Sequence, residues 1–200
     1  AHDLGKVFFQ KIRSSKTGQR VMSFRGHEFI SAYVLNSALI RVIEEDDSYR
    51  MWRLPTVFSV LYHHHAMEGR LDLWSRSYTQ YFRRTFDEGK TLLRELADLL
   101  VSFLDPSIEN LGGYIREEVL SLREIPDASS FVMKVSVGVE DIRRKIWDKF
   151  TYGGDHILRK RSLAMLSALI TADYLASNEI RGGTGTRFLR ILEEFSKLYL

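Results

Sequence analysis

The 200-residue chain contains no cysteine. This absence excludes disulfide bonds and every zinc or iron–sulfur site that needs cysteine ligands, and it favours a cytoplasmic protein. No apolar run approaches the 18 residues that a transmembrane helix requires, and no signal-peptide segment opens the chain. The sequence therefore predicts neither a membrane span nor a secreted, disulfide-bonded domain.

Proline and the side-chain amides are also scarce. Only three prolines occur in 200 residues, and long stretches follow the helical period, so we expect a mostly all-α fold with at most a minor β element. Asparagine and glutamine together number six. Few thermolabile residues and no cysteine indicate a thermophilic source.

The composition is that of a folded domain, with 44% hydrophobic and 28% charged residues. These fractions exclude a disordered chain, and 200 residues fit one domain, which we assign to 1–200. The 29 basic and 26 acidic residues leave a formal charge of +3. This mildly basic balance permits a nucleic-acid partner without requiring one.

Hydrophobic periodicity predicts helices in most of the chain. Pro55 marks an expected helix start. Residues 71–103 are expected to form either one helix or two helices with a break near Gly89. Residues 131–139 alternate polar and apolar side chains, so they are the one strand candidate, with a helix start as the alternative. The expected helices are 28–44, 56–67, 71–103, 108–122, about 156–177 and 187–199, the last after a flexible loop at 181–185.

Asp173 interrupts a segment, 163–176, that is apolar nearly all round. Such a helix is expected at the centre of the fold. A buried carboxylate without a partner costs several kcal/mol, so Asp173 is expected to have a salt bridge, strong hydrogen bonds or a metal ion.

Three consecutive histidines, His63, His64 and His65, follow the apolar segment 57–62. Successive side chains on a helix point about 100° apart, so two of them can flank one site while the third points away. Imidazole is the commonest metal ligand, which favours metal binding. Partly solvated histidines at a helix end are the alternative.

Two further histidines stand beside acidic residues. His2 precedes Asp3, with Lys6 one turn further on the same face, and His27 precedes Glu28 near an expected helix start. Taken alone, His27 fits a surface or capping residue. Together with Asp173, these histidines make a nitrogen and oxygen ligand set that suits divalent metals. Two such ions can activate a water and hold both oxygens of a phosphodiester.

Four segments carry a family resemblance. They are His2-Asp3-Leu4-Gly5-Lys6, His27-Glu28-Phe29-Ile30-Ser31-Ala32, the His63-His64 pair and Ala172-Asp173-Tyr174-Leu175-Ala176-Ser177. These segments, spread over residues 2–177, resemble the HD superfamily of metal-dependent phosphohydrolases. Within it, they look most like the HD nuclease domain of type I CRISPR interference, which occurs alone or fused to a helicase.

The resemblance implies a helical bundle around one or two divalent ions, of Mn, Mg, Ni, Co or Fe. Asp3 would bridge the ions, and Lys6 would contact a substrate phosphate. Ser31 and Ser177 would support the ligands or contact phosphate, and a shifted pair of His64 and His65 stays open. The implied metal ligands are His2, Asp3, His27, His63, His64 and Asp173.

The implied function is a metal-dependent nuclease acting on single-stranded DNA, with RNA as a further candidate substrate. No Gly-x-x-x-x-Gly-Lys-[Ser/Thr] loop is present, because the glycine-rich segment 182–187 lacks the lysine. Any ATP-driven unwinding is then expected from another chain or from a removed segment. The resemblance implies a separate CRISPR helicase and an RNA-guided surveillance complex as partners. Basic and aromatic candidates for a strand path are Arg25, Arg70, Trp74, Arg76, Arg83 and Arg84.

Two alternatives remain. The same ligands would serve an HD-type nucleotide phosphohydrolase or cyclic-nucleotide phosphodiesterase. A non-catalytic module that recruits a helicase is the other alternative, because the family has a further histidine upstream of its His-Asp motif. The chain opens at Ala1, too late to contain that histidine, so we expect that an upstream segment was removed or lies outside this sequence.

Overall fold

The computed structural model describes residues 2–8, 11–14, 20–23, 26–64, 76–102 and 109–180, with only the backbone at some positions, including residue 177. A short 3-10 helix, η1 (Leu4–Phe8), precedes strands β1 (Lys11–Ser14) and β2 (Arg20–Ser23). The helices that follow are α1 (His27–Glu45), η2 (Asp47–Tyr49), α2 (Arg50–Tyr62), α3 (Arg76–Ser102), α4 (Glu109–Arg123), α5 (Ala128–Thr151) and α6 (His156–Ile180).

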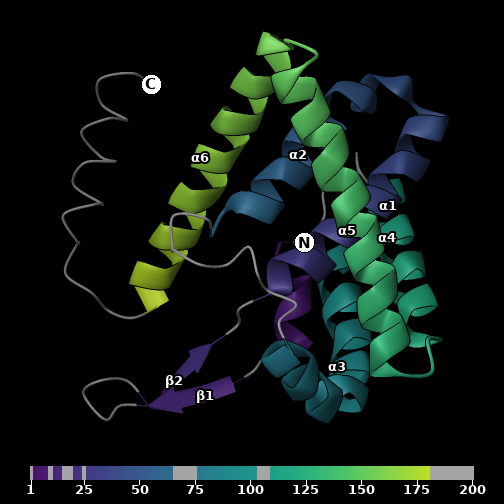
Figure 1. The fold of residues 1–200 in the computed structure, drawn as a ribbon, viewed down its shortest axis with the longest axis vertical. Helices are drawn as coiled ribbons and strands as arrows, with labels where there is room; N and C mark the ends of the chain where they lie inside the picture. The colour runs from purple at the N-terminus through teal and green to yellow at the C-terminus, as the bar shows by residue number, and fades with distance from the viewer. Residues whose placement is uncertain are drawn as a thin grey trace.

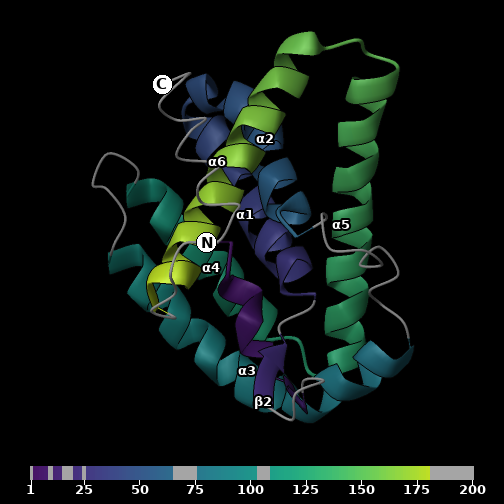
Figure 2. The same ribbon diagram turned by 90° about the vertical axis from the view of Figure 1, so that its left-hand side faces the viewer.

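This architecture confirms the predicted all-α fold with a minor β element (Figure 1). The two strands form one antiparallel hairpin in which Lys11 pairs with Ser23. Figure 2 shows α1 and α2 between α5 and α6. In the described part of the chain, no helix combines the length and the apolarity that a membrane span requires.

Helix α1 lies at the centre of the fold and contacts η1, α2, α4 and α5. Most of its side chains are buried, including the polar His27, Glu28 and Ser31 in its first turns. Three polar side chains buried next to one another on the central helix need partners within the fold. They lie where η1 crosses the start of α1.

An aromatic cluster fixes η1 against α3 and α5. The ring of Phe8 lies 5.0 Å from Phe82 and 5.1 Å from Phe131, measured between centroids, and Phe8 is fully buried. Aromatic pairs at this separation add to the stabilisation from buried area. Because Phe8 belongs to η1, the cluster also fixes the position of residues 2–6, which carry the first predicted motif.

The structure decides two alternatives that the sequence left open and corrects one helix start. For 131–139 the strand interpretation fails and the helix is confirmed, because these residues belong to α5, where Phe131, Val135 and Val139 are buried at four-residue spacing. The segment with Gly89 forms one helix, because α3 is continuous from Arg76 to Ser102, and Gly89 instead leaves room for the ring of Phe8, which a side chain there would overlap. The start at Pro55 is also wrong, because α2 begins at Arg50.

The expectation that 163–176 is central is wrong as well. Helix α6 packs one face on α2, and Leu163 and Leu175 on it are 57% and 50% exposed. An all-round apolar pattern does not by itself tell which face is covered. The predicted loop 181–185 and the predicted helix 187–199 lie outside the described residues.

Candidate metal centre

The segment 2–6 packs against the start of α1 at His27 because Gly5 has no side chain. A Cβ at Gly5 would clash with the backbone of His27, so only glycine lets η1 approach the start of α1 this closely. The amide of Gly5 donates to Ser31 Oγ at 3.0 Å, and Ser31 Oγ donates to the carbonyl of His27 at 2.9 Å. Ser31 thereby joins η1 to α1 and places Asp3 beside His27.

Of the two roles expected for Ser31, its surroundings support the positioning of ligands. The residue is fully buried and its hydroxyl serves two backbone groups. A contact with a substrate phosphate needs an accessible hydroxyl, which a fully buried side chain does not offer. Ser177 lies on α6 one turn after Asp173, but its side chain is outside the described structure.

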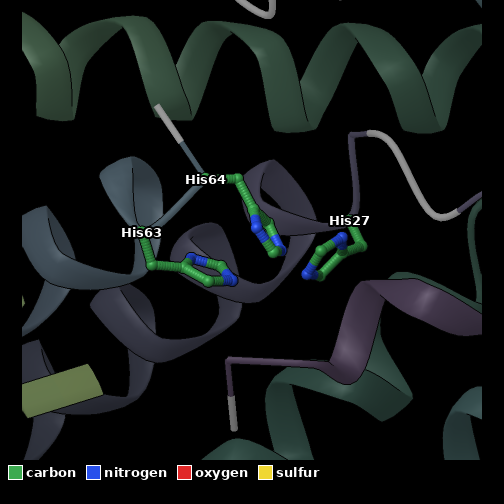
Figure 3. Close-up of side chains that lie close together, drawn as sticks. All are labelled: His27, His63 and His64. Carbon is green, nitrogen blue, oxygen red and sulfur yellow. The ribbon is translucent and has the colours of Figure 1, made fainter. Parts of the chain in front are cut away.

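The histidine pair lies at the end of α2 and reaches the same place. Helix α2 ends at Tyr62, so His63 and His64 lie in a turn, and both rings point toward His27 (Figure 3). Ring centroids are 3.8 Å apart for His63 and His64, and 5.0 Å apart for His27 and His64. The structure thus brings together the pair His63 and His64, while His65 lies outside the described residues.

One ring nitrogen of His63, Nε2, is available to bind a cation. The other nitrogen, Nδ1, donates to the carbonyl oxygen of Val60 at 2.7 Å, so in the neutral ring the lone pair is on Nε2. Burial lowers the pKa of His63 to about 4, which keeps the ring neutral at neutral pH. Nε2 is buried and has no hydrogen-bond partner in the described part of the chain.

The carboxylate of Asp3 lies beside three other polar side chains of the cluster. Its Oδ1 lies 3.3 Å from His2 Nε2 and 3.4 Å from His27 Nε2, while its Oδ2 accepts from Lys6 Nζ at 2.7 Å. Burial alone would raise the pKa of Asp3, but hydrogen bonds from His27 and Lys6 and the charge of His2 hold it well below its usual range. Asp3 is therefore ionised at neutral pH.

His2 and Asp173 complete the cluster. His2 Nε2 lies 3.9 Å from Asp173 Oδ1, and burial lowers the pKa of His2 below its ordinary value. The side chain of Asp173 is 30% exposed, so its expected deep burial is wrong, because α6 lies at the surface of the bundle. It still faces His2, as a ligand role requires.

Two groups of ligand atoms are compact enough to hold a metal ion. In one group the atoms come from His27, His63 and His64, and in the other from His2, Asp3 and His63. Within each group the ligand atoms lie within 4.8 Å of one another. Imidazole nitrogen combined with carboxylate oxygen suits divalent first-row metals. His63 belongs to both groups, and its Nε2 is buried without a hydrogen-bond partner in the described part of the chain. The residues present therefore fit one or two divalent ions.

Sequence reasoning missed Glu28 and Gly5 as contributors to this site. Glu28 is 2% exposed and its Oε2 lies 3.3 Å from His27 Nδ1. The position of Glu28 beside a histidine in a first helical turn was the available signal. Nothing local to Gly5 identified its neighbour, because His27 is 22 residues away along the chain.

The predicted strand path lies mostly beyond what the structure describes. Arg83, on α3, is exposed and donates to Ser129 Oγ at 2.8 Å, which is an ordinary surface contact between α3 and α5. The side chains of the other candidates lie outside the described structure: Arg25, Arg70, Trp74, Arg76 and Arg84.

We compared the chain with protein-family models, with curated proteins and with solved structures, and none of the three comparisons gave a match. The functional interpretation therefore rests on the residues and their geometry.

Proposed function

We propose that the protein is a divalent-metal-dependent nuclease that hydrolyses phosphodiester bonds of single-stranded DNA or RNA. One observation carries the proposal. Imidazole nitrogens and carboxylate oxygens from residues 2–3, α1 and the end of α2 lie within 4.8 Å of one another in each of two groups, and Asp173 on α6 lies 3.9 Å from His2. The resemblance to HD nuclease domains of CRISPR interference supplies the reaction class.

The six proposed ligands are His2, Asp3, His27, His63, His64 and Asp173. When bound, one or two ions of Mn, Mg, Ni, Co or Fe would activate a water and stabilise charge on the phosphate oxygens. The protein's own part is to hold the neutral ring of His63 and an ionised Asp3 at the site. Protonated imidazole cannot ligate, so the lowered pKa of His63 supports this role.

Lys6 holds Asp3 in place and is the proposed contact for a substrate phosphate. Its ammonium lies 2.7 Å from Asp3 Oδ2, and its side chain is 30% exposed, so it stands at the accessible edge of the cluster. A compact ammonium suits a phosphate oxygen as a point charge. In the cell, we assign the reaction to the cytoplasm, with a separate helicase and an RNA-guided surveillance complex as partners.

The decisive experiment is cleavage of end-labelled single-stranded DNA and RNA in the presence of Mn²⁺, Mg²⁺, Ni²⁺ or Co²⁺. We expect a chelator and Asp3→Ala each to reduce cleavage by at least about 100-fold, since both remove the metal or its central carboxylate. The matched control is Asp87→Ala on α3, where the carboxylate is 93% exposed and lies outside the cluster. This control should cleave like the wild type.

Other outcomes favour the alternatives. Hydrolysis of nucleotides or cyclic nucleotides without cleavage of polynucleotides would indicate the nucleotide phosphohydrolase. Absence of both activities and of metal binding would contradict the proposal and favour the helicase-recruiting module.

A further inference from the structure

The segment between the first two motifs of the metal centre is strongly basic. Residues 4–27 contain six of the 29 lysine and arginine residues and none of the 26 aspartate and glutamate residues. The remainder of the chain is therefore net acidic, although the whole chain carries +3. The acidic residues that bound the segment, Asp3 and Glu28, lie at the candidate metal centre. Positive charge is thus concentrated in the segment that contains β1 and β2, where it favours an anionic ligand.

The register of the hairpin places two of these cations on one face. The cross-strand pairs are Lys11 with Ser23, Ile12 with Met22, Arg13 with Val21 and Ser14 with Arg20. Because residues alternate between the two faces of a strand, Lys11 and Arg13 share one face, about 6.7 Å apart along β1. The other face carries the apolar pair Ile12 and Met22, with Arg20 at its outer end. We call the face of Lys11 and Arg13 the basic face; its spacing resembles that of consecutive phosphates in an extended single strand.

The course of the chain keeps the basic face close to the metal centre. Asp3 and His27 lie 3.4 Å apart, so the chain leaves the metal centre through η1 and returns to it at the start of α1. Ser23 precedes His27 by four residues, which span at most about 14 Å. Lys11, which pairs with Ser23, is therefore only a few nucleotide lengths from the proposed ions, and Arg13 follows further along β1. Among the described elements the two strands contact mainly each other, and Figure 1 shows the hairpin at the lower left, beside the helices.

We propose that Lys11 and Arg13 contact consecutive phosphates of a single-stranded nucleic acid and guide the strand to the metal centre. The inference rests on the proposed nuclease function and specifies its substrate, because two cations at this spacing suit a polynucleotide better than a single nucleotide. Phosphate contacts fix the position of a strand without reading its sequence, so the proposed binding does not depend on the bases. Lys16 and Arg25 lie outside the described residues and are not part of the proposed surface.

The first experiment measures binding of fluorescent single-stranded DNA and RNA to the full chain by anisotropy, with a chelator present and at several salt concentrations. The hairpin variant, Lys11→Gln with Arg13→Gln, removes both cations. Each phosphate contact on a single strand contributes about 0.7 to the slope of log affinity against log salt concentration, so the slope should become shallower by about 1.4. At low salt the Kd should rise about 10-fold. Each single substitution should produce about half of the change in slope.

Two further variants control for charge. Arg144→Gln with Lys145→Gln on α5 also removes one arginine and one lysine, which are 70% and 53% exposed and pair with Asp141. Helix α5 ends across the molecule from the hairpin (Figure 1), so this variant should keep the wild-type salt slope. The exchange Lys11→Arg with Arg13→Lys keeps both charges and should recover most of the affinity.

The second experiment measures cleavage of the same strands in the presence of Mn²⁺. The hairpin variant should show a higher KM with little change in kcat, because its residues hold the strand and do not touch the reacting phosphate. A fall in kcat at unchanged KM would instead indicate a disturbed metal centre and would contradict the proposal.

Several binding results would also overturn the proposal. They are an unchanged salt slope in the hairpin variant, an equal change in the hairpin and α5 variants, and no binding of DNA or RNA by the wild type. Binding of the wild type to anionic phospholipid vesicles in place of nucleic acid would assign the basic face to a membrane surface. Because binding is measured without metal, binding that depends on the hairpin without cleavage that depends on Asp3 would refute the nuclease and leave the strand contact in place. Cleavage by the hairpin variant at the wild-type KM would do the reverse.

Discussion

At the scale of single residues, Gly5 determines whether His2 and Asp3 can lie beside His27. We expect Gly5→Ala to weaken divalent-metal affinity by at least about 10-fold, because the added methyl group clashes with the backbone of His27 and moves His2 and Asp3. Metal titration of the folded variant measures this loss.

The control for that substitution is Gly113→Ala on α4, where a Cβ meets nothing within 4 Å. In a helix this change should stabilise the protein by up to about 1 kcal/mol and leave metal affinity unchanged. Equal metal affinities for Gly5→Ala and the wild type would contradict the role given to Gly5.

His63 makes the stability of the metal-free protein depend on pH. Its pKa is about 4 in the fold, against 6.5 for an unperturbed histidine, so on acidification the unfolded chain takes up the proton first. The contribution of His63 to the free energy of unfolding is fully present above pH 6.5. It is lost as the pH falls toward 4, by about 2–3 kcal/mol. Urea unfolding at about pH 7.5 and about pH 4.5, on either side of the ordinary histidine pKa, measures the loss.

The comparison for this prediction is His63→Gln, which has no titrating ring at that position. Its free energy of unfolding should fall less between the two pH values than that of the wild type. Identical losses in the two proteins would show that His63 titrates normally.

At the scale of elements, η1 links the core to the candidate site. Phe8→Ala should cost about 3–5 kcal/mol of stability, because it empties the space between Phe82 and Phe131. It should also weaken metal binding, because η1 then loses its anchor beside α3. Chemical unfolding and metal titration of the same variant test both effects.

Leu122→Ala on α4 is the matched control, because Leu122 is also fully buried but lies on another element. We expect a loss of about 2–5 kcal/mol without a change in metal affinity. If both variants bind metal like the wild type, η1 does not need its aromatic anchor to hold Asp3.

The sequence indicated the helices and the candidate ligands better than it indicated their surroundings. Periodicity predicted helical segments, and the residue types of His2, Asp3, His27 and His63 indicated metal chemistry. The exposed position of α6 was not predictable, because an apolar pattern does not state which neighbour covers it. The contact between Gly5 and His27 was also hidden, since it depends on how η1 crosses α1.

At the scale of the whole molecule, a bound ion would connect segments that are far apart along the chain. The proposed ligands come from residues 2–3, the start of α1, the end of α2 and α6, so unfolding would destroy the site. A divalent ion at about 100 times its Kd should therefore stabilise the fold by about 2.7 kcal/mol. Thermal unfolding with and without Co²⁺ measures the rise in Tm.

The rise in Tm should disappear in His63→Ala, because this residue belongs to both groups of ligand atoms. Arg50→Ala on α2 is a suitable control, since its side chain is 73% exposed and pairs with Asp47, which is not a proposed ligand. A rise of equal size in His63→Ala would remove His63 from the ligand set.

The hydrogen bond from His63 to Val60 also prevents the cluster from binding two ions with equal affinity. With Nδ1 occupied, His63 offers one lone pair, although it belongs to both groups of ligand atoms. An imidazole nitrogen binds one ion at a time. The first ion to bind would take this nitrogen and leave the second group with two side chains. Two ions would therefore compete for His63, and their binding would be negatively cooperative, with a tight first step and a weaker second step.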